Sequence, residues 1–235
     1  MRDYAAYQKR FVAEPRETDK VLIELVRDLA DEHPPPLRVL DIGCSTGNLL
    51  RHLDQAIPGL DLVGGELAED VLEQCRNDPD LAAITFERLD VLALERTAEF
   101  DAVIASAVLF LLDESEFAQA VASISQALRP GGALIAFDFF HPFEQRLEIH
   151  ERERTHADGL RLNFRPYSDV RALLQTHGFG PIEFRPFEIP IDLPRPERDD
   201  EIISYTHRLE TGGRLLFRGA LYQPWCHLVA RREQA

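Results

Sequence analysis

The chain has 235 residues, 45% of them hydrophobic, which allows one sizeable α/β core but leaves too little sequence for two full domains. Its 41 acidic residues against 26 lysines and arginines give a net charge of −15, which disfavours nucleic acid as a partner. We expect a cytoplasmic protein without a metal site or membrane partner, because no apolar run could span a bilayer and the cysteines are few and scattered: Cys44, Cys75 and Cys226.

Strand-like apolar runs alternate with helical periodicity along the first 140 residues. Residues 21–29 place apolar side chains on one helix face, and this helix should end before the prolines at 34–36. A second helix with apolar spacing covers 117–128 and is stopped by the sequence RPGG. Five buried parallel strands are predicted at 37–43, 60–66, 83–90, 100–106 and 132–140.

The C-terminal part adds two further strands and a hairpin. Ser168 is expected to cap a helix that Gly178 closes, followed by a sixth strand at 181–189 and a seventh at 221–232. Alternating residues on both sides of ETGG (210–213) predict an antiparallel hairpin. The predicted fold is therefore α/β: a Rossmann-like, doubly wound, mostly parallel sheet of seven strands with an antiparallel last strand and an added C-terminal hairpin.

Residues 144–161 alternate acids and arginines, and Glu148 stands four residues before Arg152, as in a helix pair. We expect a solvated helical face there, with a lid over a substrate as the alternative. Tyr4 and Tyr7 either pack ordinarily or close the same pocket from the other side. Trp225, the single tryptophan, is expected in the core rather than as a ligand platform.

The stretch VLDIGCSTGNLL (39–50) joins a strand to a helix through a turn with Gly43 and Gly47. Glycine lets the backbone bend sharply and approach a ligand, while the helix start offers unpaired N–H groups. Glu66 ends the second strand, where a carboxylate can accept both hydroxyl hydrogens of a ribose, and Asp90 ends the third. In an open α/β sheet these strand ends border one crevice, so we expect a ligand site there.

Five stretches in this order resemble the class I S-adenosylmethionine-dependent methyltransferases over roughly residues 37–140. VLDIGCSTGNLL is similar to the family's first motif, VGGELAEDVL to its ribose-binding strand end, and Leu89-Asp90 to its adenine-contacting acid. FDAVIASAVLFLLDE and LRPGGALIAFD are similar to its fourth strand and the helix-to-strand turn that follows. Five motifs at family spacing are more specific than any single one.

The resemblance implies S-adenosylmethionine as cofactor and S-adenosylhomocysteine as product. It places the methionine part at the first turn, the ribose on Glu66, and the adenine beside Asp90. Ser45 departs from the family by replacing a glycine of the first motif, and Phe110 stands where many small-molecule members have histidine. The cofactor-binding residues so implied are Asp41, Gly43, Cys44, Ser45, Gly47, Glu66, Leu67, Asp90, Val91, Ala105 and Ser106, the last two lining the methyl-transfer crevice.

The resemblance predicts one methyltransferase domain over 1–235, with an N-terminal helical cap (1–36), a cofactor-binding core (37–140) and a substrate-side and C-terminal sheet region (141–235). The expected activity is methyl transfer to an O, N or S atom of a small molecule. Two alternatives stay open: a non-catalytic S-adenosylmethionine-binding module, and an NAD-dependent oxidoreductase, whose GxGxxG spacing this chain lacks.

A hydroxyl or amine acceptor would need a base, and His141, directly after the fifth strand, is the first candidate for a catalytic base. His150, His207 and His227 are weaker candidates. The C-terminal hairpin is expected either to select the substrate as a lid, or to extend the sheet or form a homodimer contact. Its polar side chains are Tyr205, His207, Arg214 and Arg218.

Overall fold

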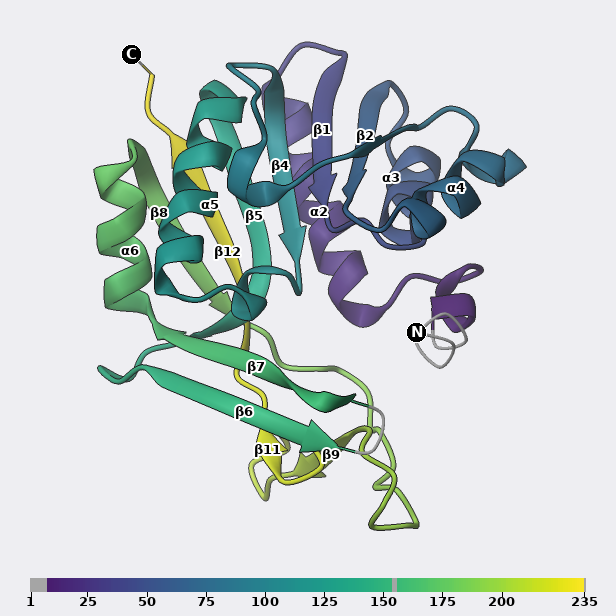
Figure 1. Cartoon of the computed structure of the whole chain (residues 1–235), viewed down its shortest axis with the longest axis vertical. Coiled ribbons are helices and arrows are strands. Elements are labelled where there is room, and N and C mark those ends of the chain that lie inside the picture. Colours follow the sequence, from purple (N-terminus) through teal and green to yellow (C-terminus); the bar gives the residue numbers. More distant parts are fainter. Residues whose placement is uncertain (1–7, 154–155, 235) are drawn as a thin grey trace.

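The computed structural model describes residues 8–153 and 156–234 and confirms the expected mostly parallel sheet with an antiparallel last strand (Figure 1). The strand order is β3-β2-β1-β4-β5-β12-β8. Strands β1 to β5 pair in parallel, whereas β12 runs antiparallel between β5 and β8. The bounds are β1 Leu37–Ile42, β2 Leu60–Glu66, β3 Thr85–Arg88, β4 Phe100–Ser106, β5 Leu128–His141, β8 Phe179–Pro186 and β12 Trp225–Arg232.

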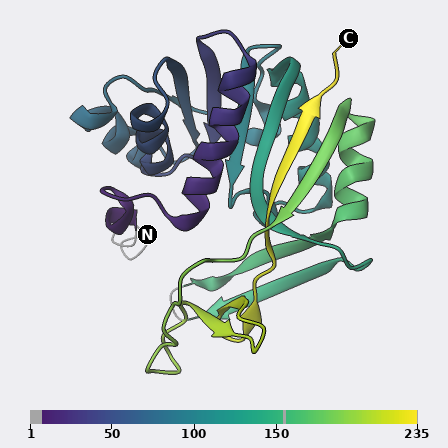
Figure 2. The ribbon, with the colours of Figure 1, turned by 180° about the vertical axis from the view of Figure 1, so that it is seen from behind.

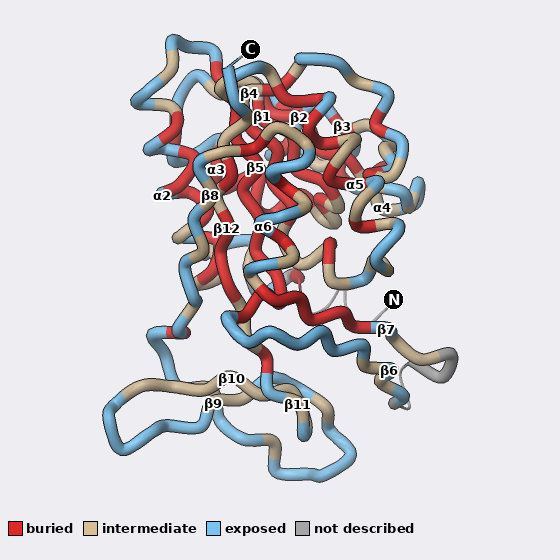
Figure 3. Tube along the Cα trace, turned by 90° about the vertical axis from the view of Figure 1, so that its left-hand side faces the viewer, coloured by how far each residue is buried: buried red, intermediate tan, exposed pale blue. Residues whose placement is uncertain are grey.

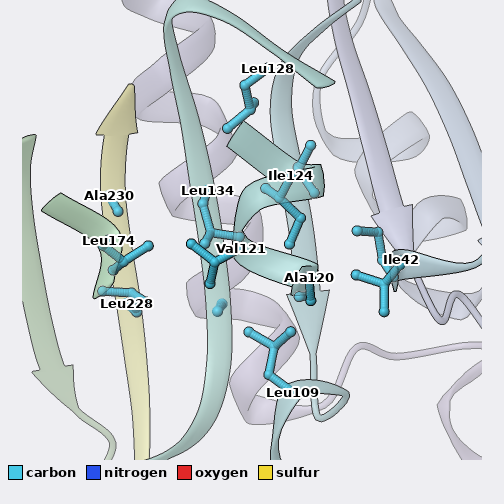
Figure 4. Packing of buried hydrophobic residues seen from close by; sticks show 14 of the residues in the cluster. Ile42, Leu109, Ala120, Val121, Ile124, Leu128, Leu134, Leu174, Leu228 and Ala230 are labelled. Carbon is cyan, nitrogen blue, oxygen red and sulfur yellow. The ribbon is translucent and has the colours of Figure 1, made fainter. Parts of the chain in front are cut away.

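Helices cover both faces of this sheet, as Figures 1 and 2 show from opposite sides. Apolar residues of α2, α3 and α4 pack with one face, and those of α5 and α6 pack with the other (Figure 4). The helix bounds are α2 Glu17–Glu32, α3 Asn48–Ala56, α4 Glu69–Asn77, α5 Glu114–Ala127 and α6 Tyr167–Thr176, with short 3₁₀ helices η1 Lys9–Phe11, η2 Pro79–Leu81, η3 Val91–Ala93 and η4 Leu109–Leu111. Among the described residues, no helix is long and apolar enough to cross a membrane.

Local sequence explains where α5 begins and ends. At its start the Asp113 side chain accepts the N–H of Glu116 (2.9 Å), and the Glu116 side chain accepts the N–H of Asp113 (2.8 Å). At its end the sequence turns through Pro130 and Gly131, whose φ of +83° suits glycine. By contrast, α6 is preceded by Pro166, not capped by Ser168 as predicted, because the Ser168 hydroxyl instead donates to Glu144 (2.8 Å).

The expectation of a helix within 144–161 is wrong. The chain there forms strands β6 (Leu147–Glu153) and β7 (His156–Pro166), which pair antiparallel. Alternation of charge with a period of two suits a strand, and Glu148 contacts Arg161 across the hairpin (3.1 Å) rather than forming a helical pair with Arg152. This hairpin joins the end of β5 through β7.

The predicted C-terminal hairpin is present as β9 (Ser204–Arg208) and β10 (Arg214–Arg218), with Gly212 in the turn at φ +90°. The expected strand at 221–232 is divided, because β11 (Leu221–Tyr222) pairs with β10 and only β12 enters the main sheet. Figure 3 shows a mostly exposed and half-buried small sheet beneath the buried main sheet. An ion pair between Arg218 and Glu151 links it to the β6–β7 hairpin.

Candidate active site

The turn after β1, which we call the cofactor loop (residues 43–47), has an open backbone held against β2. Gly43 and Gly47 have φ of +68° and +72°, and Ser45 adopts a left-handed conformation at +49°. The N–H groups of Gly43 and Cys44 both donate to the carbonyl of Gly65 (2.8 and 3.1 Å). The helix α3 begins immediately afterwards at Asn48, so the loop joins strand to helix as predicted.

Glu66 connects the end of β2 to the cofactor loop. One carboxylate oxygen accepts the N–H of Ser45 (3.2 Å), and the other accepts those of Leu67 (2.7 Å) and Ala68 (3.2 Å). A carboxylate offers about four acceptor positions, so these bonds leave one for a further donor. Leu67 beside it is 51% exposed, which provides an apolar surface at this strand end.

Asp90 and Val91 lie next to Glu66, because the N–H of Leu89 donates to the carbonyl of Glu66 (3.2 Å). The Asp90 side chain accepts the N–H of Leu92 (2.9 Å) and starts the short helix η3. Asp90 is exposed and Val91 is buried, so an acid and an apolar side chain border the same strand ends.

Asp41, at the end of β1, is buried and interacts electrostatically with the carboxylates of Asp19 and Glu66. Burial raises the pKa of Asp41 to about 8, with further increases from Asp19 and Glu66 and an opposing effect of Arg16. Asp19, at the start of α2, is fully buried and paired with Arg16 (2.8 Å). A cationic group placed here would be stabilised by this acidic set.

The end of β4 borders the crevice on its other side. Ala105 is fully buried, and the Ser106 hydroxyl is buried without a hydrogen-bond partner among the described residues. Ala107 follows in a left-handed conformation (φ +58°), and its N–H donates to the carbonyl of Phe137 (2.8 Å). Strained positive φ at a non-glycine residue clusters at functional sites. Ser45 and Ala107 have this conformation in the turns after β1 and β4, and Glu95 and Ala98 have it in the connection between β3 and β4.

His141 lies farther along β5. In the strand ladders Ser106 pairs with Phe137, whereas His141 pairs with Pro166 of β7. Four residues of strand separate Phe137 from His141, which is about 13 Å at about 3.3 Å per residue. Both ring nitrogens of His141 are buried, and burial lowers the pKa of its imidazole against the opposing effect of backbone groups of Phe143 and Phe164.

The other histidines and tyrosines that the sequence suggests for the site occupy separate places. His227 is buried, lies 3.2 Å from the Thr18 hydroxyl, and has its pKa lowered to about 4 by burial. His150 and His207 are exposed on β6 and β9. Tyr4 and Tyr7 lie outside the described residues.

A group of aromatic rings next to Ser106 is not evident from the sequence. Phe137 stacks on Trp225 (4.5 Å between centroids), and Trp225 also contacts Phe139 (4.2 Å) and Phe110 (5.9 Å). Trp225 is half-buried and packs against two apolar clusters, so it joins the core to the strand ends. Strand alternation could have indicated that Phe137, Phe139 and Trp225 are near one another, but only the register shows it.

Comparison with known proteins agrees with this geometry. Residues 39–132 match the family model described as a methyltransferase domain. The chain is 31% identical over 121 residues to dTDP-3-amino-3,4,6-trideoxy-alpha-D-glucopyranose N,N-dimethyltransferase of Streptomyces venezuelae, covering 49% of each. It is 30% identical over 118 residues to demethylmenaquinone methyltransferase of Thermus thermophilus, covering 49% of this chain and 52% of the relative. Residues 39–132 are therefore similar to a methyltransferase domain, as the resemblance to the class I S-adenosylmethionine-dependent methyltransferases predicts.

Solved structures agree on the fold over more of the chain. A 1,6-didemethyltoxoflavin-N1-methyltransferase from Burkholderia thailandensis covers 99% of this chain and 86% of its own, with a TM-score of 0.63 and 16% identity. A methyltransferase from Methanosarcina mazei covers 87% and 96%, with a TM-score of 0.61 and 16% identity. The chain spans about half the length of the curated relatives it matches.

The residues present fit S-adenosylmethionine, the cofactor of this family. A Cβ on Gly43 would lie 2.7 Å from Val108, so packing within the protein requires glycine at this position whether or not a ligand is bound. Glu66 keeps one acceptor position for a ribose hydroxyl beside the exposed Leu67. The hydroxyls of Thr46 and Ser106 are buried without partners among the described residues, and a polar ligand can satisfy them.

Proposed function

We propose that this protein transfers a methyl group from S-adenosylmethionine to an O, N or S atom of a small molecule. The observation that carries the proposal is the convergence of the cofactor loop, Glu66, Asp90 and Ser106 at the carboxyl ends of β1, β2, β3 and β4. The names of the matched relatives support a small-molecule acceptor, since they specify a dTDP-linked amino sugar and demethylmenaquinone. The net charge of −15 also disfavours nucleic acid.

The bound cofactor supplies a methyl group on an electrophilic sulfonium. The cofactor loop would hold the methionine part, Glu66 the ribose, and Asp90 with Val91 the adenine. Asp41 and Asp19 would stabilise the cationic end through the acidic set around them. The remaining task of the chain is to align the acceptor and exclude water, which by itself accounts for large rate effects.

His141 would act as the base for a hydroxyl or ammonium acceptor. Its lowered pKa keeps the imidazole neutral near pH 7 and able to accept a proton. Because His141 lies about four strand residues beyond the level of Ser106, an acceptor that reaches both must extend along β5. A carboxylate or thiolate acceptor would need no base.

Calorimetry with S-adenosylmethionine and S-adenosylhomocysteine tests the proposal. We expect both to bind, and Glu66→Ala to weaken each by about 1.5–3 kcal/mol per lost charge-assisted hydrogen bond. Glu73→Ala is the matched control, because Glu73 is exposed on the neighbouring helix α4. Absence of binding to either compound, together with binding of an NAD analogue, would refute the proposal.

Turnover is tested with isotopically labelled cofactor and a panel of small carboxylates, phenols and amines. Transfer of label to one class identifies the acceptor atom. Cofactor binding with no transfer to any of a broad panel would favour a binding module instead.

A further inference from the structure

The turn after β4, residues 107–113, packs against the cofactor loop. Val108 fills the space beside Gly43, with its Cγ2 at 2.7 Å from where a Cβ of Gly43 would lie. The same turn begins with the left-handed Ala107 and continues through η4. Any displacement of this turn therefore reaches the cofactor loop through Val108.

Three buried polar side chains from β5 and β7 hold this turn by its backbone. The N–H of Phe110 donates to Asp138 (3.0 Å), and the carbonyl of Phe110 accepts from Asn163 (3.0 Å). Arg165 donates to the carbonyls of Leu109 (3.1 Å) and Leu112 (2.5 Å). Both backbone groups of Phe110 and two neighbouring carbonyls are thus fixed by side chains distant in sequence.

The Arg165 guanidinium has further partners at the start of α5. It donates to Glu114 (3.0 Å) and lies over the ring of Phe117, 4.1 Å from the centroid. Arg165 is 1% exposed, Asn163 5% and Asp138 0%. Burying such groups costs free energy that apolar side chains of similar size would not require. What polar groups add is direction, because hydrogen bonds fix where the backbone atoms of the turn lie.

Phe110 carries this constraint to the acceptor side. Its ring contacts Phe139 (4.9 Å between centroids) and Trp225 (5.9 Å, edge-on), and Trp225 stacks on Phe137, the strand neighbour of Ser106. The turn therefore touches the cofactor loop through Val108 and the aromatic rings through Phe110. A non-glycine residue in the left-handed region, such as Ala107, persists only where its surroundings hold it.

We propose that Asp138, Asn163 and Arg165 form a clamp that positions the 107–113 turn between cofactor and acceptor, and that these are positioning residues for methyl transfer. The inference rests on the proposed function, since it assigns the turn a place in that reaction. It makes the β6–β7 hairpin, which supplies two of the three side chains, part of the catalytic scaffold. The clamp acts through Phe110 and Val108 rather than by touching reacting atoms.

The test uses Asn163→Leu and Arg165→Lys in the full chain. Asn163→Leu removes one hydrogen bond at nearly constant volume, and Arg165→Lys keeps the charge while losing the planar set of donors. Ser125→Ala is the matched control, because its buried hydroxyl donates to the carbonyl of His177 (2.7 Å) between α5 and α6, away from the turn. The melting temperature of each variant is measured first. The comparison is made between variants whose melting temperatures fall by similar amounts, so that differences between them do not come from global stability.

Three readouts separate positioning from stability alone. We expect amide hydrogen exchange within 107–113 to accelerate about tenfold or more in both clamp variants. The emission of Trp225, the single tryptophan, should shift as the Phe110 ring moves. Affinity for S-adenosylhomocysteine should fall about three- to tenfold through Val108 and Gly43, whereas Ser125→Ala should change none of the three.

Unchanged exchange and emission in both clamp variants would overturn the inference. If wild type binds no S-adenosylhomocysteine, the proposed function fails, but exchange and Trp225 emission still decide whether the clamp holds the turn. If those two readouts change while the affinity of a binding-competent protein does not, the clamp does not reach the cofactor loop and the inference is also overturned.

Discussion

Two regions of this molecule are built by different means: residues 37–140, which carry the proposed cofactor site and are called the cofactor side, and residues 141–234, which are proposed to meet the acceptor and are called the acceptor side. On the cofactor side, backbone groups and strand-end acids form the site, and each lies directly after its own strand. On the acceptor side, side chains hold the structure across long sequence separations, as when Asn163 binds Phe110 and Arg218 binds Glu151. The first arrangement follows from strand order, whereas the second depends on register.

The largest expected effect tests whether the bare backbone of the cofactor loop is essential. Gly43→Val places a side chain into Val108 at a position with φ +68°, so we expect cofactor affinity to fall at least about 100-fold. Calorimetry with S-adenosylhomocysteine measures this. Gly178→Ala is the control, since φ is +75° there but a Cβ would meet nothing within 4 Å.

Gly178→Ala should cost about 1–2 kcal/mol of stability and leave cofactor affinity unchanged. Equal losses of affinity in both variants would mean that backbone strain alone, not the close approach at Gly43, determines binding.

The next effect tests whether the acceptor side contributes chemistry as well as shape. With a hydroxyl or amine acceptor, we expect His141→Asn to lower kcat roughly 100-fold, most strongly at pH values where the acceptor is protonated. His207→Asn, at an exposed histidine of β9, provides the control. Turnover of the His141 variant within about threefold of wild type at every pH would leave positioning as the sole contribution of this side.

Sequence periodicity predicts the cofactor side well for a physical reason. Buried parallel strands are apolar, and ligands of such sheets bind at their carboxyl ends, so Gly43, Glu66 and Asp90 can be placed at these ends from the sequence alone. The roles of these residues toward the cofactor stay predictions. The helix expected in place of the β6–β7 hairpin is wrong because the i, i+4 spacing of Glu148 and Arg152 also fits a strand whose charges pair across the ladder.

The clamp could not be predicted from sequence at all. Arg165 sits in an ordinary strand pattern, and nothing local shows that its guanidinium binds carbonyls more than fifty residues earlier. The sequence also does not show that Asp138 is buried. In the structure, burial raises the pKa of Asp138 to about 7. Long-range polar contacts of this kind depend on the packed fold.

A smaller effect concerns the acidic set on the cofactor side. In the free protein the pKa of Asp41 is raised to about 8 by burial, then by Asp19 and Glu66 against the opposing effect of Arg16. A bound cation favours the ionised form of Asp41, so cofactor binding should release a proton. Below pH 8 the cofactor affinity should therefore increase as pH rises, by up to about tenfold per pH unit. Calorimetry in buffers of different ionisation enthalpy measures the proton released, and Asp41→Asn should abolish that release.

Unfolding provides an independent check on the same group. The folded pKa lies above the ordinary value of 3.8, so between these pH values the folded state keeps a proton that the unfolded state has lost. The contribution of Asp41 to the free energy of unfolding of the cofactor-free protein should therefore fall as pH rises from about 4 to about 8, by up to about 1.4 kcal/mol per pH unit. A denaturant series in which Asp41→Asn shows the same slope as wild type would contradict this assignment.

The smallest effect asks what the C-terminal sheet does for the acceptor side. Arg218 of β10 pairs with Glu151 of β6, so the small sheet is tied to the hairpin that carries Asn163 and Arg165. Because the side chains of Arg218 and Glu151 are only 24% and 17% exposed, loss of Arg218 should cost about 1–3 kcal/mol of stability. We expect Arg218→Met to lower acceptor turnover several-fold while cofactor affinity stays within about twofold, since loops and appended elements tend to carry specificity. Arg198→Met, at an exposed ion pair with Asp200, should leave both unchanged.

If turnover in Arg218→Met matches that control, the small sheet is not a lid. A dimer that becomes a monomer on this substitution, measured by sedimentation, would instead identify the sheet as a contact between two copies of the chain.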